Sequence, residues 1–290
     1  MSDLEVRQLR YFVAVAEELH FGRAAARLGM AQPPLSRAVR DIERQLGVRL
    51  LERTTRNVAL TAAGETLLRD ARHALDAVTA AGRRARNAGL STPTLRLALK
   101  ADYDAGLLPQ IVAAYRREEA ALPVEPLLGG RGEQVPALHD GRADVALLPT
   151  PYDPRGLDDE PLMTEPNLVA LAATDPLAAR PELSLSDFAG RKLPDGAPAD
   201  LGPQRPHRGP SRLDMTQIFN LIEIGRILFF VPASVARRYT RPDIVYREVT
   251  DLPPAGLVVA WPQECRSPAV AAFVRAALAV ASAAAPVPAT

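Results

Sequence analysis

The sequence is poor in the residues that build disulfides and most metal sites. It has one cysteine, Cys265, and four histidines that are scattered along the chain. A single cysteine excludes a disulfide within the chain and any metal site built from several cysteines. No two histidines stand at a spacing typical of metal ligands. We therefore expect no metal ion and no other cofactor.

Long apolar runs are also missing. No stretch approaches the ~18 consecutive apolar residues that a membrane-spanning helix needs. Residues 1–10 alternate charged with apolar side chains, so they lack the basic segment followed by an apolar stretch that marks a secretory signal. The expected location is the cytoplasm.

Common catalytic motifs are absent as well. The sequence contains no Gly-x-Ser-x-Gly nucleophile motif and no His-Glu-x-x-His zinc motif. The glycine-rich run at residues 129–132 lacks the Lys-Ser/Thr continuation of a phosphate-binding loop. We predict that the protein is not an enzyme.

What the sequence does have is an uneven distribution of charge. Residues 1–88 contain 15 arginines and 10 acidic residues and carry a net charge of +5, whereas the remainder carries −4. A basic front half favours binding to a polyanion. Chance asymmetry is the alternative, and charge by itself leaves both open.

The N-terminal apolar pattern predicts three short helices. Leu9, Phe12 and Val13 begin a helical stripe, and a second helix follows at about residues 21–28. Gly29 suits a helix C-terminus, where a positive φ is needed. The third helix starts near Pro33, since proline fits a first helical turn, and ends near residue 46.

Two short helices joined by a tight turn predict a helix-turn-helix. The stretch at residues 48–60 reads as two strands around a polar turn, which is a candidate wing. The N-terminal domain is therefore predicted to be a winged helix-turn-helix over residues 1–61.

A long helix is predicted over residues 62–88, with Thr61 as its N-cap. Its small and apolar residues recur at alternating spacings of three and four, which favours pairing with another helix. An amphipathic helix packed on its own domain is the alternative. The seam residues are Leu68, Ala71, Leu75, Val78, Gly82 and Ala85. Residues 62–93 would form the dimerisation helix and hinge.

From residue 94 the pattern alternates strands with helices, as in a parallel sheet covered by helices. We predict an α/β effector domain over residues 94–290 with two subdomains. Subdomain I takes about 94–163 and 240–290, and subdomain II takes about 164–239. The proline-rich segment 191–212 is expected to be an irregular or mobile loop. Such folds bind ligands at the carboxyl ends of their strands.

Several motifs resemble those of the LysR-type transcriptional regulators. They include FGRAAARL at 21–28, QPPLSR at 32–37, LER at 51–53 and LTAAG at 60–64, with looser matches such as GRADVA at 141–146 and VPASVA at 231–236. The resemblance implies a DNA-binding transcription regulator whose effector domain is like the periplasmic binding proteins. It also implies homodimers or homotetramers, a small-molecule effector, contact with RNA polymerase, and double-stranded DNA with an imperfect inverted repeat.

In a helix-turn-helix the second helix of the motif enters the major groove with its N-terminal residues on base edges. An alternative for Arg37 is a surface ion pair with Asp41, four residues on. For Arg23 and Arg27 a solvated face is the preferred interpretation. The predicted DNA-binding residues are Gln32, Pro33, Pro34, Ser36, Arg37, Arg40, Arg53, Thr54, Arg56 and Thr61.

The resemblance places effector contacts in loops after the first two strands of the effector domain and at a helix start in subdomain II. The candidate effector-binding residues are Lys100, Asp102, Tyr103, Asp104, Gly130, Arg131, Thr150 and Thr216. Asp102 and Asp104 stand where many relatives have a small hydroxyl residue. We therefore hypothesise that a simple aromatic acid is not the effector. The alternative is that both aspartates are solvated and irrelevant.

Asp104 is also a candidate cap for the helix that follows it. A further departure from the family pattern lies at Ile227 and Phe229, which are bulkier than the usual residues. They either narrow the ligand site or pack as core.

Two other classes of function remain to be weighed. A solute-binding protein would fit the C-terminal part alone, and an enzyme with an attached DNA-binding domain would need a catalytic site.

Overall fold

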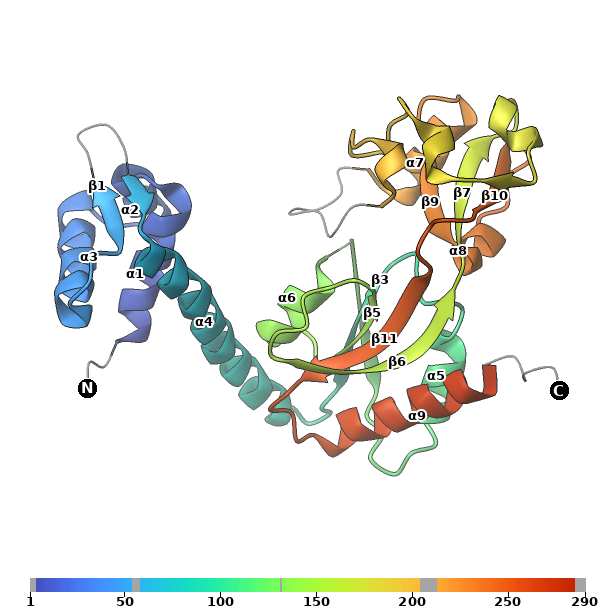
Figure 1. Ribbon diagram of the computed structural model, residues 1–290. Coiled ribbons are helices and arrows are strands. Elements are labelled where there is room, and N and C mark those ends of the chain that lie inside the picture. Colours follow the sequence, from blue (N-terminus) through green and yellow to red (C-terminus); the bar gives the residue numbers. More distant parts are fainter. Residues whose placement is uncertain (1–3, 54–57, 131, 204–212, 285–290) are drawn as a thin grey trace. The chain divides into compact units, whose positions relative to one another are not determined.

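The computed structural model describes residues 4–53, 58–130, 132–203 and 213–284. The chain divides into two compact units (Figure 1). One comprises residues 1–86 with 139–141, and the other comprises residues 87–138 with 142–290. Each unit is described by itself below.

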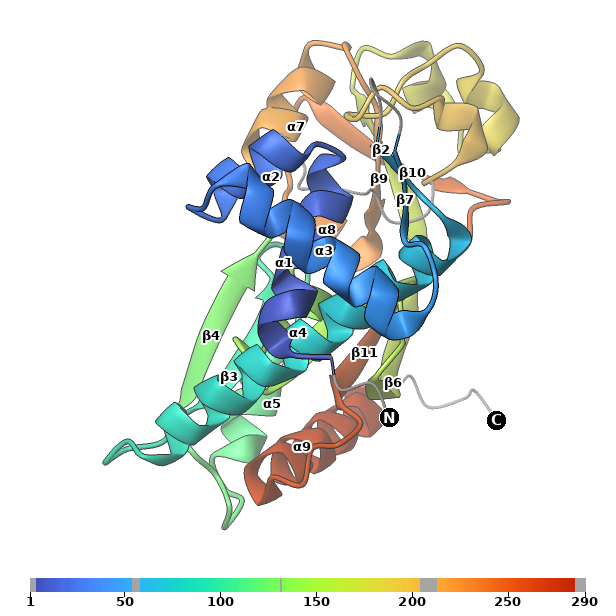
Figure 2. The ribbon, with the colours of Figure 1, turned by 90° about the vertical axis from the view of Figure 1, so that its left-hand side faces the viewer.

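The N-terminal unit has the predicted helix-turn-helix. Its helices are α1 (Val6–Glu18), α2 (Phe21–Arg27) and α3 (Gln32–Leu46). They enclose a core in which Phe12, Leu35, Val39 and Ile42 are completely buried. Figure 2 views the unit with α3 in front.

Local sequence signals explain where these helices begin and end. Pro33 lies in the first turn of α3, where its missing N–H costs no hydrogen bond. Gly29 after α2 and Gly47 after α3 both have φ near +70°, at 65° and 71°. That backbone conformation is cheap for glycine and strained for most other residues. The predicted turn between the two helices is thereby confirmed.

A two-stranded antiparallel wing follows, formed by β1 (Leu51–Arg53) and β2 (Val58–Leu60). The long helix α4 (Ala62–Ala88) comes next, and Thr61 is its N-cap as predicted. The Thr61 hydroxyl accepts from the Gly64 amide at 3.0 Å and donates to the Arg49 carbonyl at 2.7 Å. The N-cap therefore also ties the start of α4 to the chain that precedes the wing.

The seam of α4 is packed in its first part and exposed further along the helix. Its first part packs on the unit's own helix α1, since buried Ala71 and half-buried Leu68 and Leu75 join a cluster with Leu9 and Val13. Further along, the seam is exposed at Val78, Gly82 and Ala85. The alternative interpretation, packing on its own domain, thus holds for the seam residues of the first half of the helix, and Ala80, which lies off the seam, is buried as well.

The C-terminal unit contains a five-stranded sheet in the order β4-β3-β5-β11-β6, which is subdomain I. Its strands are β3 (Leu95–Lys100), β4 (Val124–Gly129), β5 (Val145–Pro149), β6 (Leu157–Glu165) and β11 (Ala255–Pro262). Helices α5 (Leu108–Tyr115) and α9 (Pro268–Ala284) pack with Leu97 and Leu99 on one face. Helix α6 (Gln134–His139) packs with Ala98 and Ala146 on the other.

Subdomain II is built on a four-stranded sheet in the order β8-β10-β7-β9. Its elements are β7 (Asn167–Ala172), β8 (Glu182–Leu183), β9 (Phe229–Pro232), β10 (Ile244–Val249), α7 (Met215–Glu223) and α8 (Ala233–Arg238), with short 3-10 turns at Pro176–Ala179, Leu185–Phe188 and Ala199–Leu201. Strand β10 pairs with β7. The chain therefore returns to subdomain I after residue 249, not near residue 240 as the sequence pattern suggested.

The segment 191–212 is irregular as expected, but its described part, residues 191–203, is anchored. Leu193 and Ala199 are buried in the subdomain II core, and Arg191 forms an ion pair with Asp175. The many prolines and glycines therefore shape a packed connection here. Residues 204–212 lie outside the described part of the chain.

The contact between α4 and the wing depends on one glycine. A Cβ added to Gly64 would lie 2.0 Å from the Leu50 carbonyl oxygen, whereas a Cβ on Gly82 in the same helix would meet nothing within 4 Å. We expect Gly64→Ala to destabilise the N-terminal unit by about 1–3 kcal/mol. Gly82→Ala, the control, should stabilise the helix of the monomer by about 0.5–1 kcal/mol, so both variants are compared at a protein concentration too low for self-association. Hydrogen exchange of α1 and α4 would measure both, and equal protection in the two variants would contradict this account.

Candidate DNA-binding surface and effector-binding edge

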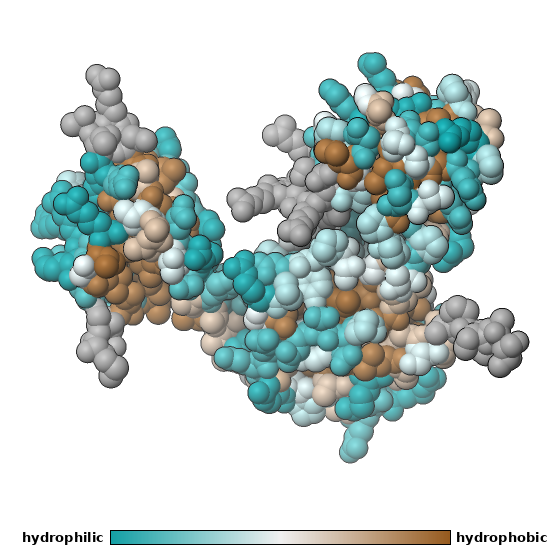
Figure 3. All heavy atoms as spheres, viewed as in Figure 1, coloured by the Kyte–Doolittle hydropathy of each residue, from teal (hydrophilic) through white to brown (hydrophobic). Residues whose placement is uncertain are grey.

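The outward face of α3 is open to solvent from its first turn onward. Of the predicted DNA-binding residues, Gln32, Pro33, Pro34, Arg37 and Arg40 are exposed and Ser36 is half-buried. Hydrophilic residues cover the side of this unit on which α3 lies (Figure 3). The helix thus presents to solvent the residues that the sequence assigned to base edges.

The proposed ion pair between Arg37 and Asp41 does not form. Asp41 accepts instead from Arg44 at 2.6 Å, three residues further along α3. Within the described residues, no acidic side chain forms an ion pair with Arg37. The alternative role for Arg37 as a structural cation is therefore wrong in this conformation.

Arg53 has a different environment from the arginines of α3. Its guanidinium donates to the Glu43 carboxylate at 3.0 Å and lies 4.8 Å from the centre of the Phe21 ring. Burial and the neighbouring Arg40 cation lower the pKa of Arg53, against the opposing effect of Glu43. Contact between Arg53 and DNA stays a prediction. Thr54 and Arg56, also predicted to bind DNA, lie outside the described residues.

A second ion-pair network joins helix α4 to helices α1 and α2. Glu17 on α1 accepts from Arg27 at 2.7 Å, and from Arg72 on α4 at 3.0 Å and 2.7 Å. Arg23 pairs with Glu18. Arg23 and Arg27 are exposed, as the preferred interpretation expects, and each also has an intramolecular ion-pair partner.

The candidate effector residues converge on one edge of subdomain I. Strands β3, β4 and β5 are parallel, so their carboxyl ends lie at the same edge of the sheet. Lys100 ends β3, Gly130 follows β4 and Thr150 follows β5. Thr216 lies in the first turn of α7 in subdomain II, and Arg131 lies outside the described residues.

The two aspartates of the loop after β3 are buried, with exposed fractions of 9% for Asp102 and 6% for Asp104. The alternative that they are solvated is therefore wrong. Asp102 is paired with Lys100, and Asp104 with Arg238 of α8 in subdomain II. Asp104 does not cap α5, because its carboxylate accepts from the Gly106 amide and the cap residue is Leu107.

Glu165 and Tyr103 add further polar groups near this loop. The buried Glu165 carboxylate accepts from the amide and hydroxyl of Ser234 at 2.7 Å and 2.5 Å. Tyr103 is buried, and among the described residues no group lies in hydrogen-bonding geometry with its hydroxyl. Burial and the Glu165 charge raise the pKa of Tyr103. The edge is thus rich in carboxylates that already have partners.

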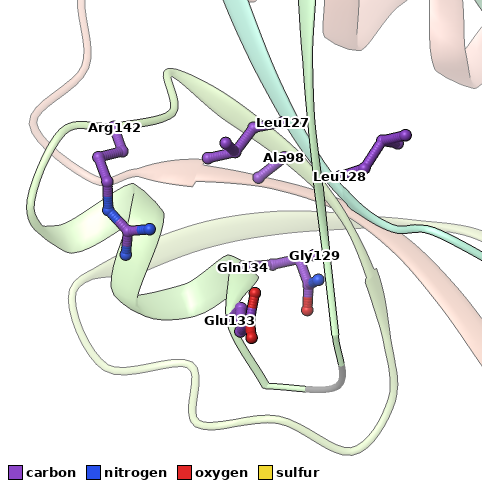
Figure 4. Close-up of a pocket in the computed structure, with 7 residues that line it drawn as sticks. All are labelled: Ala98, Leu127, Leu128, Gly129, Glu133, Gln134 and Arg142. Atoms are coloured by element: carbon purple, nitrogen blue, oxygen red, sulfur yellow. The ribbon is translucent and has the colours of Figure 1, made fainter. Parts of the chain in front are cut away.

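A cavity of about 30 Å³ lies between β4 and the start of α6 (Figure 4). It is lined by Ala98, Leu127, Leu128, Gly129, Glu133, Gln134 and Arg142. That volume suits about one water molecule, so it holds no drug-sized effector. Ile227 and Phe229, the two bulky departures from the family pattern, pack with the hydrophobic cluster around Phe219, and they therefore serve as core.

Comparison with known families agrees with this geometry. Residues 6–65 match the model of the bacterial regulatory helix-turn-helix protein of the lysR family, and residues 88–282 match the LysR substrate binding domain. The chain belongs to the LysR family. It is a LysR-type DNA-binding transcriptional regulator with an effector-binding domain, and this family consists of regulators, not enzymes.

Two curated LysR-type relatives match nearly the whole chain. The HTH-type transcriptional regulator AlsR of Bacillus subtilis (strain 168) is 31% identical over 93% of this chain and 94% of its own length. The Hca operon transcriptional activator HcaR of Escherichia coli (strain K12) is 30% identical over 93% of this chain and 96% of its own length.

Solved structures of a LysR family regulator, CbnR, are also similar. One has a TM-score of 0.58 at 27% identity and covers 96% of this chain and 99% of its own. Full-length CbnR in complex with its target DNA has a TM-score of 0.56 at 28% identity, over 96% and 100% of the two chains. In the part of this LysR-type chain that the structure describes, no helix is both long and apolar enough to cross a membrane.

Three residues at these sites were missed by reasoning from the sequence. Nothing in the spacing of Glu43 reveals that its carboxylate accepts hydrogen bonds from Leu50, Leu51 and Arg53. Glu165 and Arg238 find partners 69 and 134 positions away. Side-chain pairs at such separations leave no periodic pattern in one sequence.

The Glu17 network makes stability depend on pH. Burial alone would raise the Glu17 pKa, but hydrogen bonds from Arg72 and Arg27 lower it below its ordinary value of 4.5. The carboxylate therefore stabilises the fold above that pH, and this stabilisation is lost as pH falls through the lowered pKa. We expect Glu17→Gln to destabilise the unit at pH 7, by less than about 1 kcal/mol because the arginines are half exposed.

The difference between Glu17→Gln and the wild type should shrink below pH 4, and hydrogen exchange of α1, corrected for the intrinsic rate at each pH, would follow it. A gap that stays constant from pH 7 to pH 3 would rule out this contribution. Arg72→Gln should give the same pH dependence with a smaller amplitude, since Arg27 remains to pair with Glu17.

Proposed function

We propose that this regulator binds an imperfect inverted repeat as a homodimer, with α3 of each subunit in the major groove. The observation that carries this proposal is the exposed polar face of α3, which begins at the helix N-terminus. A two-fold dimer places its two reading helices about one DNA turn apart. Its DNA target places the protein in the cytoplasm.

Within α3 we assign different tasks to different residues. Gln32, Pro34 and Arg37 read base edges, since amide, methylene and guanidinium groups match adenine, the thymine methyl group and guanine. Pro33, Ser36 and Arg40 lie against the backbone. Thr61 caps the positive end of α4 and directs it at a phosphate.

The exposed part of the α4 seam supports the homodimer. Val78, Gly82 and Ala85 continue the heptad spacing beyond the part that packs on α1, and Val78 is 44% exposed. Small residues let two helices approach closely. The regulator acts as this homodimer or as a homotetramer of two such dimers, and the DNA-bound complex contacts RNA polymerase. In this proposal the DNA-binding domain ends at residue 61, and the dimerisation helix with its hinge ends at residue 93.

We place the effector at the carboxyl edge of subdomain I, facing Thr216 at the start of α7. Lys100, Asp102, Tyr103, Asp104, Gly130, Arg131 and Thr150 complete the set. Asp102 and Asp104 support an effector other than a simple aromatic acid. The nearby cations Lys100 and Arg238 are already paired with these aspartates, so a bound carboxylate would compete with them.

The assignment of Arg37 leads to a test on DNA. Arg37→Ala should weaken binding to a duplex from the region upstream of the gene by ~1–3 kcal/mol if it touches a base, and Arg40→Ala should weaken it less. Fluorescence anisotropy gives the affinities, and footprinting gives the site. Unchanged footprints and affinities for both variants would mean that α3 does not read the DNA.

The effector hypothesis is tested by calorimetric titration with benzoate. We expect no binding tighter than about 1 mM in the wild type. Asp102→Asn should bind benzoate more tightly, because a buried like charge is removed while Lys100 stays. Tight benzoate binding to the wild type would sink the hypothesis, and an unchanged Asp102→Asn would show that Asp102 does not face the ligand.

A further inference from the structure

Glu43 of α3 has every carboxylate oxygen occupied by the wing. One oxygen accepts from the backbone amides of Leu50 and Leu51 at 3.0 Å and 3.2 Å. The other accepts from the Arg53 guanidinium at 3.0 Å. The Glu43 side chain is only 16% exposed. One side chain of the reading helix therefore holds the first residues of the wing.

Arg53 extends this link to a third element. Its guanidinium lies between the Glu43 carboxylate and the ring of Phe21, the first residue of α2. Planar stacking on an aromatic ring and hydrogen bonding to a carboxylate are both favourable for guanidinium. The contacts of Arg53 thus tie β1 to α2 and α3 at once.

These contacts change what Arg53 offers to DNA. Its side chain is 26% exposed and its charge is balanced by Glu43. Arg40, one turn before Glu43 on α3, is exposed. Burial is the main cause that lowers the pKa of Arg53, and the Arg40 cation adds to it. A phosphate approaching this surface therefore meets the charge of Arg40 first.

We propose that Glu43 is a positioning residue that fixes the wing against the recognition helix, and that Arg53 acts through Glu43 while Arg40 supplies the phosphate contact. This inference rests on α3 being the DNA-reading helix. It departs from the sequence prediction that Arg53 contacts DNA directly.

Glu43→Gln changes the affinity for DNA in opposite directions, depending on whether Glu43 positions the wing or acts only as a surface charge. Removing an acidic charge beside DNA ordinarily strengthens binding, because repulsion with phosphate falls. If Glu43 positions the wing, Glu43→Gln instead weakens binding to the upstream duplex by about tenfold, the loss of one charge-assisted hydrogen bond. Binding to a mixed-sequence duplex of the same length should be unchanged or tighter.

Glu52→Gln is the matched control. Glu52 is on β1, is exposed, and carries the same charge. This variant should bind both duplexes as tightly as the wild type or more tightly. A Glu43→Gln protein that matches Glu52→Gln on both duplexes would overturn the positioning role.

The salt dependence of binding separates Arg40 from Arg53 and does not depend on the Glu43 variant folding. Each phosphate contact contributes about 0.9 to the slope of log affinity against log salt. Arg40→Ala should reduce that slope by about 0.9. Arg53→Ala should weaken specific binding and leave the slope unchanged, as charges that do not touch phosphate are screened within ~10 Å at 0.1 M salt.

If Arg40→Ala and Arg53→Ala reduce the salt-dependence slope equally, Arg53 contacts phosphate directly and the inference is overturned. The wild type is the internal reference for the proposed function. If it does not prefer the upstream duplex, the DNA assignment of α3 fails and the inference falls with it. If the wild type shows that preference and the variants behave alike, only the positioning role fails.

Discussion

Helix α3 has to meet two demands at once, and the N-terminal unit is organised around that constraint. Its inner face buries Leu35, Val39 and Ile42 completely, which fixes the helix in the core. Its outer face has to remain free of intramolecular partners if it is to meet DNA. Close packing on one side fixes the backbone of the helix, so only the exposed side chains would have to be ordered on binding DNA.

Ion pairs with carboxylates determine which arginines of the N-terminal unit remain available to bind phosphate. The N-terminal part is rich in arginine, yet Arg27, Arg44, Arg53 and Arg72 each have an acidic partner within the unit. An arginine held by a carboxylate contributes little further attraction for phosphate. Net charge therefore overstates how many cations face DNA, and the arrangement of the acidic residues carries more information than their number.

Most elements of this fold could be predicted from the sequence, because helical and strand periodicities are local. The helix-turn-helix, Thr61 as a cap and the long helix α4 all follow from short-range patterns. Strand β6 was missed because its acidic run and Pro161 resemble a loop. It is an edge strand with an irregular register, where proline is tolerated.

The candidate sites were less predictable, because their partners are distant in sequence. For Asp102 and Asp104 the sequence left effector contact and solvation open, with Asp104 also a candidate cap. Only the fold shows that both are buried and that Asp104 pairs with Arg238, 134 positions away. Arg53 was predicted to contact DNA because it lies in the candidate wing. Its environment is set by Phe21 and Glu43, which no spacing rule connects to it.

The pairing of Asp104 with Arg238 also limits how a signal can act on the effector domain. Asp104 is buried in the loop after β3, whereas Arg238 is 42% exposed at its side chain on α8. Separating the two would leave a buried carboxylate without its cation, which costs far more than exposing the arginine. A ligand at this edge changes the relation between the two subdomains only if it interacts differently with the paired and separated arrangements. An effector at this edge would therefore have to replace Arg238 beside Asp104 or strengthen the pair that already exists.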